Sequence, residues 1–307
     1  MKVMIIQENK KELIVIAGPT GIGKTSLSIE LALKLNTEII SADSRQIYKE
    51  LCIGTAVPSD EELAKVKHHF IQNISIHEAY NASKYEEDVN LLLIELFQKY
   101  DKVILCGGSG MYIDAVCKGI DDLPSVDAET RNRIQLQLEN EGIESLLEDL
   151  IKLDPSSFDK IDLRNPKRIQ KALEVSIITG KPYSSFLTSP EKKRFYSVKK
   201  IVLNMDREIL YDRINKRVDA MIREGLVDEA RNMYPLRKIN ALNTVGYKEL
   251  FSYFGGEISL EEAITAIKSN TRNYVRKQLT WFRKDPDAKW FHPSEFEGIM
   301  SFITETK

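Results

Sequence analysis

The octapeptide GPTGIGKT, residues 18–25, constrains the fold more than any other stretch of the chain. Its spacing, a glycine, four residues and then Gly23-Lys24-Thr25, matches the Walker A pattern of phosphate-binding loops. Such a loop joins a buried strand to a helix. The sequence supplies both, since ELIVIA (12–17) is a short apolar run and SLSIELALKL (26–35) has the composition of a helix. The motif therefore predicts an α/β fold built around a phosphate site.

The chemistry of this loop follows from its residue types. Glycines let the backbone turn with its N–H groups pointing inward, and the helix N-terminus adds positive partial charge. Lys24 can neutralise terminal phosphate oxygens, and the Thr25 hydroxyl can ligate Mg²⁺. The predicted phosphate-binding residues are Gly18, Pro19, Thr20, Gly21, Ile22, Gly23, Lys24 and Thr25.

Three further apolar segments are expected to be strands: TEIISAD (37–43), KVILCGG (102–108) and KIVLNMD (200–206). A helical pattern at 85–100 precedes the strand at 102–108, and another follows residue 206. DPDAKWFH suggests a last short strand. Strands alternating with helices predict a P-loop-type parallel sheet covered by helices on both faces. Ligand sites in such sheets lie at the carboxyl ends of the strands.

The stretch between the third and fourth predicted strands has no strand signal of its own. Residues 121–198 carry helix-start signals such as SVDAET and a helix stop at TGKP (179–182). We therefore expect a core domain of residues 1–120 and 199–307 and an inserted all-helical subdomain of residues 121–198.

Composition narrows the function further. The 307 residues carry a net charge of -2, which argues against a strongly basic DNA-binding domain but permits a local basic surface. No apolar run reaches the length of a membrane span. The three cysteines form no CxxC pair, so we expect reduced thiols and no zinc site. The first residues contain no long h-region and no A-x-A cleavage site, so we expect a cytoplasmic protein, and net charge and length favour a monomer.

One local basic surface stands out. From Ile264 to Lys284 there are six Lys or Arg residues and no Asp or Glu. Lys268, Arg272, Arg276 and Arg283 have helical spacing along one stripe, with Lys277 beside it. Such a stripe suits a nucleic-acid backbone, although on its own it could equally be a solvated helix face.

The charged side chains expected near the loop do not decide which phosphorylated ligand it binds. A hydrolytic ATPase usually has a second strand that ends in an acid, whereas VILCGG ends in glycines. The acid nearest a strand end is Asp43, whose alternative interpretation is a cap for the following turn. Arg213 and Arg217 lie four residues apart on one helix face, so they could clamp a phosphate or remain solvated.

Several blocks together resemble one family. In addition to the loop, DSRQIYKELCIGTAVPS, GGSGMY, RNPKRIQKALEV, TGKP, NTVGYKEL and RKQLTWFRKD occur in the order and spacing of the tRNA dimethylallyltransferases, also called tRNA isopentenyltransferases. The resemblance runs from Leu13 to about Trp290. It implies transfer of a dimethylallyl group from dimethylallyl diphosphate to N6 of adenine 37 in tRNA. The loop would then hold the diphosphate of the donor and Mg²⁺, and ATP would not be consumed. Loops of this type bind nucleotides such as ATP in many proteins, so occupation by a nucleotide stays open.

The resemblance also implies roles for individual residues. Asp43 would orient N6 and accept its proton, while Arg217, Lys24 and Mg²⁺ on Thr25 would stabilise the leaving diphosphate. Ser109 would contact tRNA, although the family more often has Thr there. The other residues implied to contact the tRNA anticodon stem-loop are Asp43, Ser44, Arg45, Gln46, Arg131, Lys167, Arg168, Ile169, Gln170, Lys171, Asn243, Gly246, Lys248, Arg276, Lys277, Gln278, Trp281 and Arg283.

Other chemistry-bearing residues are expected to be structural. Tyr112 is expected to pack in the core, and the adjacent His68 and His69 are assigned no ligand role. No zinc-finger pattern is visible at the C-terminus.

Two other functions use the same features. A P-loop small-molecule kinase would have the sheet and loop, but it would lack the helical insertion and the IGTA and TWFR blocks. A non-enzymatic tRNA-binding module would have no use for the Lys24-Thr25 pair together with Asp43.

Overall fold

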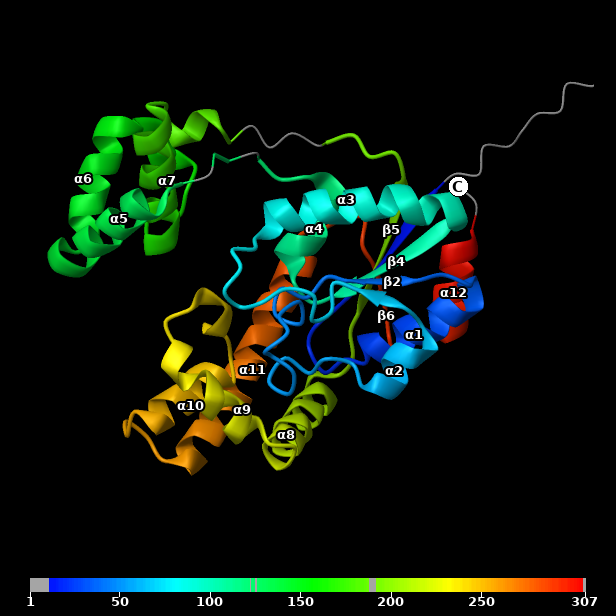
Figure 1. The fold of residues 1–307 in the computed structure, drawn as a ribbon. Helices are drawn as coiled ribbons and strands as arrows, with labels where there is room; N and C mark the ends of the chain where they lie inside the picture. Colours follow the sequence, from blue (N-terminus) through cyan, green and yellow to red (C-terminus); the bar gives the residue numbers. More distant parts are fainter. Residues whose placement is uncertain (1–10, 122, 125, 188–191, 306–307) are drawn as a thin grey trace, which may run out of the picture. The chain divides into compact units, whose positions relative to one another are not determined.

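The computed structural model describes residues 11–121, 123–124, 126–187 and 192–305. They form two compact units (Figure 1), one up to Cys117 and from Lys193 onward, the other from Lys118 to Lys192. The domain borders expected from the sequence lie a few residues C-terminal of these. In the described part of the chain, no helix is both long and apolar enough to cross a membrane.

The first unit is built on a parallel sheet with the strand order β3-β2-β4-β1-β5-β6. This confirms the predicted fold class. Its strands are β1 (Glu12–Ala17), β2 (Ile39–Ser41), β3 (His68–His69), β4 (Lys102–Gly107), β5 (Ser197–Leu203) and β6 (Lys289–Phe291).

Helices cover both faces of this sheet. In Figure 1, α3 and α4 lie on one side and α1 and α12 on the other. Buried Tyr112 on α4 packs as expected. The helices of the unit are α1 (Lys24–Leu35), α2 (Asp60–Lys65), α3 (Ala82–Lys99), α4 (Gly110–Lys118), α8 (Arg207–Arg223), α9 (Leu226–Met233), α10 (Tyr247–Phe254), α11 (Leu260–Phe282) and α12 (Phe296–Thr304), with short 3₁₀ turns η3 (Tyr234–Leu236) and η4 (Asn240–Leu242).

The strand order places the phosphate loop at the centre of the sheet edge. β1 lies between β4 and β5, the chain runs from β1 to β2 on one side, and β5 and β6 follow on the other. This reversal of direction leaves a crevice at the carboxyl end of β1, where such sheets bind ligands.

The second unit is helical, as predicted. Asp127 caps its first helix by accepting the N–H of Thr130, and α7 ends at Gly180, whose φ of 64° favours glycine. Its apolar core includes Ile134, Leu150 and Ile169. The elements are α5 (Ala128–Glu141), α6 (Ile143–Leu153), η1 (Pro155–Asp159), α7 (Pro166–Thr179) and η2 (Tyr183–Ser185).

Strands β2, β3 and β5 differ from those expected from the sequence, each for its own reason. β2 is only Ile39–Ser41, because Asp43 turns the chain immediately afterwards. β3 was not predicted, since two residues leave no periodic signal. β5 begins at Ser197 rather than at residue 200, so it includes the adjacent Lys199 and Lys200 as buried strand residues.

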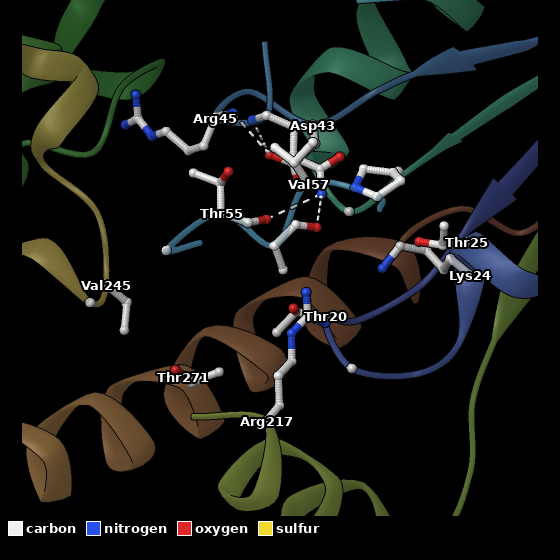
Figure 2. Close-up of a pocket in the computed structure, with 18 of the residues that line it drawn as sticks. Thr20, Lys24, Thr25, Asp43, Arg45, Thr55, Val57, Arg217, Val245 and Thr271 are labelled. Carbon is white, nitrogen blue, oxygen red and sulfur yellow. Dashed lines mark hydrogen bonds between the residues drawn. The ribbon is translucent and has the colours of Figure 1, made fainter. Parts of the chain in front are cut away.

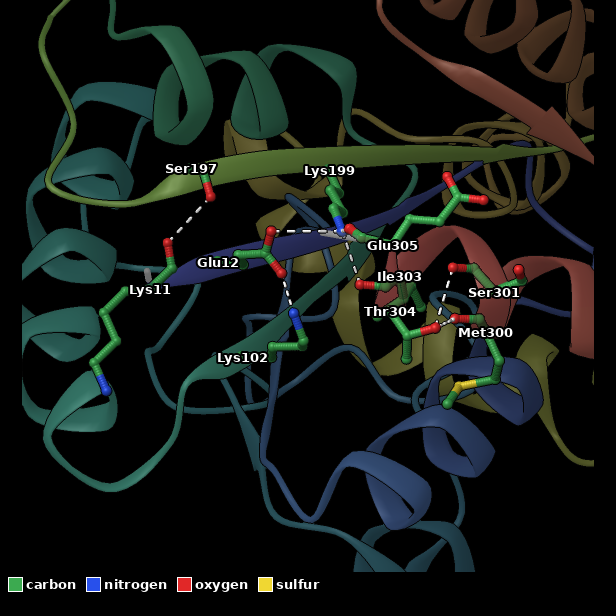
Figure 3. Close-up of polar contacts among 10 residues, drawn as sticks. All are labelled: Lys11, Glu12, Lys102, Ser197, Lys199, Met300, Ser301, Ile303, Thr304 and Glu305. Carbon is green, nitrogen blue, oxygen red and sulfur yellow. Dashed lines mark hydrogen bonds and ion pairs between the residues drawn. The ribbon is translucent and has the colours of Figure 1, made fainter. Parts of the chain in front are cut away.

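These two lysines point to opposite faces of the sheet, and each finds acceptors there. Lys200 Nζ donates to Asp285 Oδ2 at 2.5 Å. Lys199 Nζ donates to the carbonyl oxygens of Ile303 (2.8 Å) and Glu305 (2.6 Å) at the end of α12 (Figure 3). Glu12 lies between Lys199 and Lys102 and pairs with both. A cation at a helix C-terminus is also favoured by the helix dipole.

Replacing Lys199 with methionine is expected to destabilise the first unit. The change removes two charge-assisted hydrogen bonds and leaves the buried Ile303 carbonyl without this donor, which should lower the free energy of unfolding by about 2–3 kcal/mol. Lys216→Met is the matched control, because Lys216 forms an exposed pair with Asp212 and should cost no more than about 0.5 kcal/mol. Urea unfolding measures both, and equal losses would contradict this role of Lys199.

Candidate active site

The turn between β1 and α1 has the form of a phosphate-binding loop. β1 ends at Ala17 and α1 begins at Lys24, which confirms the predicted strand–loop–helix arrangement. Gly21 (φ 78°) and Gly23 (φ 104°) adopt left-handed conformations that residues with a side chain rarely adopt. The first N–H groups of α1 have no acceptor within the helix, so they can donate to an anion.

Gln278 of α11 holds this loop from outside. Its Oε1 accepts the N–H of Thr20 at 3.0 Å, and its Nε2 donates to the Gly108 carbonyl at 2.9 Å. A Cβ on Gly108 would lie 2.4 Å from that Nε2, so a larger residue there would displace the Gln278 side chain from this hydrogen bond. The side chain is buried and its amide is hydrogen-bonded within the protein, so Gln278 fixes the loop, and its expected contact with tRNA stays a prediction. The Thr20 N–H is consequently taken and is not a phosphate donor.

A cavity of about 750 Å³ lies beside the loop. Figure 2 shows Lys24 and Thr25 on one side of it, Asp43 on another, and Arg217 reaching in from α8. The structure thus brings together residues from distant parts of the chain that the sequence nominated. The nominated residues lining the cavity are Thr20, Gly21, Gly23, Lys24, Thr25, Asp43, Ser44, Arg45, Gln46, Arg217, Asn243, Gly246, Lys248 and Gln278.

Positive charge is concentrated in this cavity. Burial, opposed by Cys106 and Asp43 and aided by Arg217, lowers the pKa of the Lys24 ammonium to about 8. Lys24 Nζ donates to the Pro19 carbonyl at 2.8 Å. Burial also lowers the pKa of Arg217, against the attraction of Asp43. No ion pair of Arg217 is found within 4 Å in the described part of the chain, so its guanidinium is available to an anion.

The two carboxylate oxygens of Asp43 have different surroundings. Oδ1 accepts the backbone N–H groups of Arg45 (2.9 Å) and Gln46 (3.3 Å), which caps the turn after β2. Among the described residues no hydrogen bond to Oδ2 is found, and Asp43 lines the cavity. Both interpretations of Asp43 are thus compatible, since one oxygen holds the turn and the other can serve a substrate.

Ser109 ties the turn after β4 to the turn after β2. Its Oγ accepts the N–H of Ser44 at 3.0 Å and donates to Ser44 Oγ at 3.2 Å. The strands approach so closely that a Cβ on Gly107 would lie 2.1 Å from the Ala42 carbonyl oxygen. The implied contacts of Ser109 and Ser44 with tRNA stay predictions, but both residues first serve to shape this edge.

Few protein side chains in the cavity could act as ligands of a metal ion. Thr25 lines the cavity, and no hydrogen bond of its hydroxyl is found among the described residues. Those residues contain no group of three or more His, Cys, Asp or Glu placed to hold a metal ion. Mg²⁺ at phosphate sites usually takes few protein ligands and completes its shell with phosphate and water oxygens. A site made by Thr25 and a bound diphosphate fits this chemistry.

The basic residues of α11 lie outside the cavity. Arg276, Lys277 and Arg283 are exposed, as a contact with nucleic acid requires. Trp281 packs over Gly110, and its Nε1 donates to Asp114 Oδ2 at 2.7 Å. A separate hollow of about 420 Å³ on this helix is lined by Asn273, Arg276, Lys277, Thr280, Trp281 and Lys284.

The remaining nominated residues belong to the second unit. Arg131, Lys167 and Arg168 present charge at its surface, and Lys171 and Gln170 are partly exposed. Ile169 is fully buried in the core of that unit. Its expected contact with tRNA is therefore wrong for the side chain, which packs inward while its basic neighbours point outward.

Sequence reasoning missed some cavity residues. Tyr274 and Thr271 of α11 line it, as does His68, whose Nδ1 lies 2.8 Å from the Val66 carbonyl. Burial raises the pKa of the Tyr274 hydroxyl to about 12, and Asp43 adds to the shift. The hydroxyl thus stays protonated and can donate. Tyr274 and Trp281 are seven residues apart in the sequence, but this spacing does not indicate that Tyr274 faces a ligand.

Comparisons with known proteins agree on one family. The family model described as IPP transferase matches residues 46–285. A tRNA dimethylallyltransferase of Christiangramia forsetii is 55% identical over 292 residues, covering 95% of this chain and 97% of that protein.

Solved structures give the same result. The tRNA isopentenylpyrophosphate transferase of Bacillus halodurans has a TM-score of 0.68 and 36% identity, covering 95% of this chain and 94% of that one. A eukaryotic dimethylallyltransferase, described as acting on tRNA, has a TM-score of 0.76 and 25% identity, covering 94% of this chain and 75% of that one.

The lowered pKa of Lys24 predicts a pH dependence of diphosphate binding. Below about pH 8 the ammonium is charged and attracts the anion, and above it the charge is lost. The affinity for a nonreacting alkyl diphosphate should therefore fall roughly tenfold from about pH 7 to about pH 9. Calorimetric titration measures it. Lys24→Arg is the control, since a guanidinium stays charged throughout; the same decline in that variant would exclude Lys24 as the titrating group.

Proposed function

The chain belongs to the IPP transferase family, and we propose that it transfers a dimethylallyl group from dimethylallyl diphosphate to N6 of adenine 37 in tRNA. The observation that carries the proposal is one cavity with a phosphate loop and two half-buried cations, Lys24 and Arg217, on one side and a carboxylate, Asp43, on another. This arrangement can hold an anionic leaving group and a weakly acidic amine at the same time.

The leaving group would be stabilised by charge placed in advance. As the bond between C1 of the allyl group and oxygen breaks, negative charge grows on the diphosphate. Lys24, Arg217 and the free amides at the start of α1 would face that charge in a partly dehydrated site, where such interactions are strong. Mg²⁺ held by Thr25 would, when bound, neutralise further charge on the same oxygens.

Asp43 would act on the acceptor. The lone pair of an adenine N6 is delocalised into the ring, so N6 attacks only weakly. Oδ2 of Asp43 would accept a hydrogen bond from N6 and take its proton as the bond from N6 to C1 forms. Oδ1 is held by the Arg45 and Gln46 amides, so the carboxylate is already oriented.

The adenine must leave its stack to enter the cavity. Base flipping costs less in a single-stranded loop than in a duplex, which suits an anticodon loop. The exposed Arg276, Lys277 and Arg283 would contact phosphates of the same RNA. Action in the cytoplasm and as a monomer stays a prediction.

A small-molecule kinase would use the same sheet and loop. It would need a second strand ending in an acid that handles Mg²⁺ or the nucleophile. β4 instead ends in Gly107, which Gly108 follows, and a Cβ on Gly107 would collide with the backbone of Ala42. The kinase alternative is therefore less well supported.

Mass spectrometry of tRNA nucleosides tests the proposed reaction. Incubation of unmodified tRNA with the protein, Mg²⁺ and dimethylallyl diphosphate should give N6-isopentenyladenosine and one diphosphate per prenyl group, without ATP. Release of phosphate from ATP in a tRNA-dependent way, with no prenylated adenosine, would refute the proposal and favour a kinase or ATPase.

Asp43→Asn is expected to slow turnover by about a hundred- to ten-thousandfold. The asparagine oxygen can still accept the Arg45 and Gln46 amides, so the turn and the melting temperature should be preserved. Affinities for tRNA and for the donor should change little. Single-turnover kinetics at saturating substrates measures the step, and a loss below about threefold would leave Asp43 only its capping function.

A further inference from the structure

One wall of the cavity is a segment without regular structure, residues 52–57, which we call the wall segment. Gly54, Thr55, Ala56 and Val57 line the cavity, and Figure 2 shows Thr55 and Val57 across the open space from Arg217. A loop in this place would ordinarily be adaptable, because helices and strands do not support its backbone.

The side chain of Glu229 on α9 supports this backbone. Its Oε2 accepts the N–H groups of Cys52 (3.0 Å) and Ile53 (2.8 Å), and its Oε1 accepts the N–H of Gly54 (2.8 Å). Oε1 also accepts the hydroxyl of Tyr247 at 2.6 Å. Four donors thus converge on one carboxylate, and three of them belong to consecutive residues of the wall segment.

The wall segment is held from its other side as well. Gln46 Nε2 donates to the carbonyl oxygens of Thr55 (3.2 Å) and Ala56 (2.8 Å). Ala56 has a φ of 51°, a left-handed conformation that costs free energy for a residue with a side chain. A Cβ on Gly54 would lie 2.6 Å from the Tyr247 ring. The surrounding contacts therefore impose one shape on this segment.

We propose that Glu229 is a positioning residue for prenyl transfer: its carboxylate fixes the wall segment so that the acceptor base and the allyl carbon meet in line. The proposal rests on the proposed function. The phosphate loop holds the donor by its diphosphate, which leaves the opposite wall to limit how the reacting groups lie. Such limits matter, since a displacement of about 1 Å at a reacting centre can cost about a hundredfold in rate.

The carboxylate of Glu229 is suited to holding the backbone of the wall segment, and it takes no part in the chemical step. All its hydrogen bonds are made to the protein's own donors, and it is absent from the residues that line the cavity. A carboxylate can accept from four donors at once, whereas the amide of glutamine would turn an N–H₂ group toward two of them. Glu229→Gln should therefore release part of the wall segment while preserving side-chain volume.

The expected signature is a loss in turnover without a loss in donor binding. At saturating tRNA and dimethylallyl diphosphate, kcat of Glu229→Gln should fall about ten- to a hundredfold. The Kd of a nonreacting alkyl diphosphate should stay within about threefold of wild type, because the phosphate loop has no hydrogen bond with the wall segment. A merely structural role would lower the melting temperature and leave kcat of the folded protein unchanged.

Two further variants complete the test. Asp228→Asn removes an exposed carboxylate from the same helix and should change neither quantity. Tyr247→Phe removes one of the four hydrogen bonds, keeps the ring against Gly54, and should lower kcat by about three- to tenfold. If Glu229→Gln does not fold, the Tyr247→Phe result decides.

The outcomes separate the two proposals. If wild-type protein makes no N6-isopentenyladenosine, the proposed function fails. If wild type makes it and the folded Glu229→Gln and Tyr247→Phe variants retain kcat within about twofold, the positioning role is refuted. A fall in kcat that equals the fall of Asp228→Asn would refute it as well.

Discussion

Two half-buried cations and one carboxylate, Asp43, govern the candidate site. Lys24 and Arg217 both lose hydration, and their lowered pKa values report that cost. Asp43 is the carboxylate that attracts both, and its Oδ1 is already occupied by backbone amides. A multiply charged ligand at the phosphate loop would offset the desolvation of both cations at once. The site is therefore tuned to an anion that carries more than one negative charge.

Side-chain to backbone hydrogen bonds keep this charge in place. Gln278 joins the phosphate loop to the turn after β4, and Ser109 joins that turn to the turn after β2. Gln46 and Glu229 form hydrogen bonds with the backbone of the wall segment from two sides. None of the segments they hold is a helix or strand. The rigidity of the cavity thus comes from polar side chains anchored on α9, α11 and the strand ends, whose loss would loosen the site before it unfolds the sheet.

The sequence predicted what depends on local pattern. The loop between β1 and α1, the central strands and the helix stop at TGKP follow from short motifs and periodicity. Asp43 was placed correctly because strand ends of a parallel sheet share one edge. Family resemblance supplied segments but not the direction of each side chain, so the inward-facing Ile169 was assigned to tRNA.

Long-range pairing was beyond sequence reasoning. Glu229 acts through residues 52–54 and through Tyr247, three places far apart in the chain that no local pattern connects. The same holds for Lys199, whose acceptors lie at the end of α12. The two-residue strand β3 was not predicted because it is too short to show an alternating pattern.

The position of β1 has a consequence for how the protein acquires its activity during synthesis. Glu12 pairs with Lys102 on one side and with Ser197 on the other, so β1 stays an open edge until the second unit and β5 have been made. The phosphate loop is the continuation of that strand, and Gln278 arrives later still. Contacts so distant in sequence form slowly. A ribosome-bound chain that ends before α11 therefore lacks the Gln278 contact that completes the phosphate loop, so this loop reaches its final form only near the end of translation.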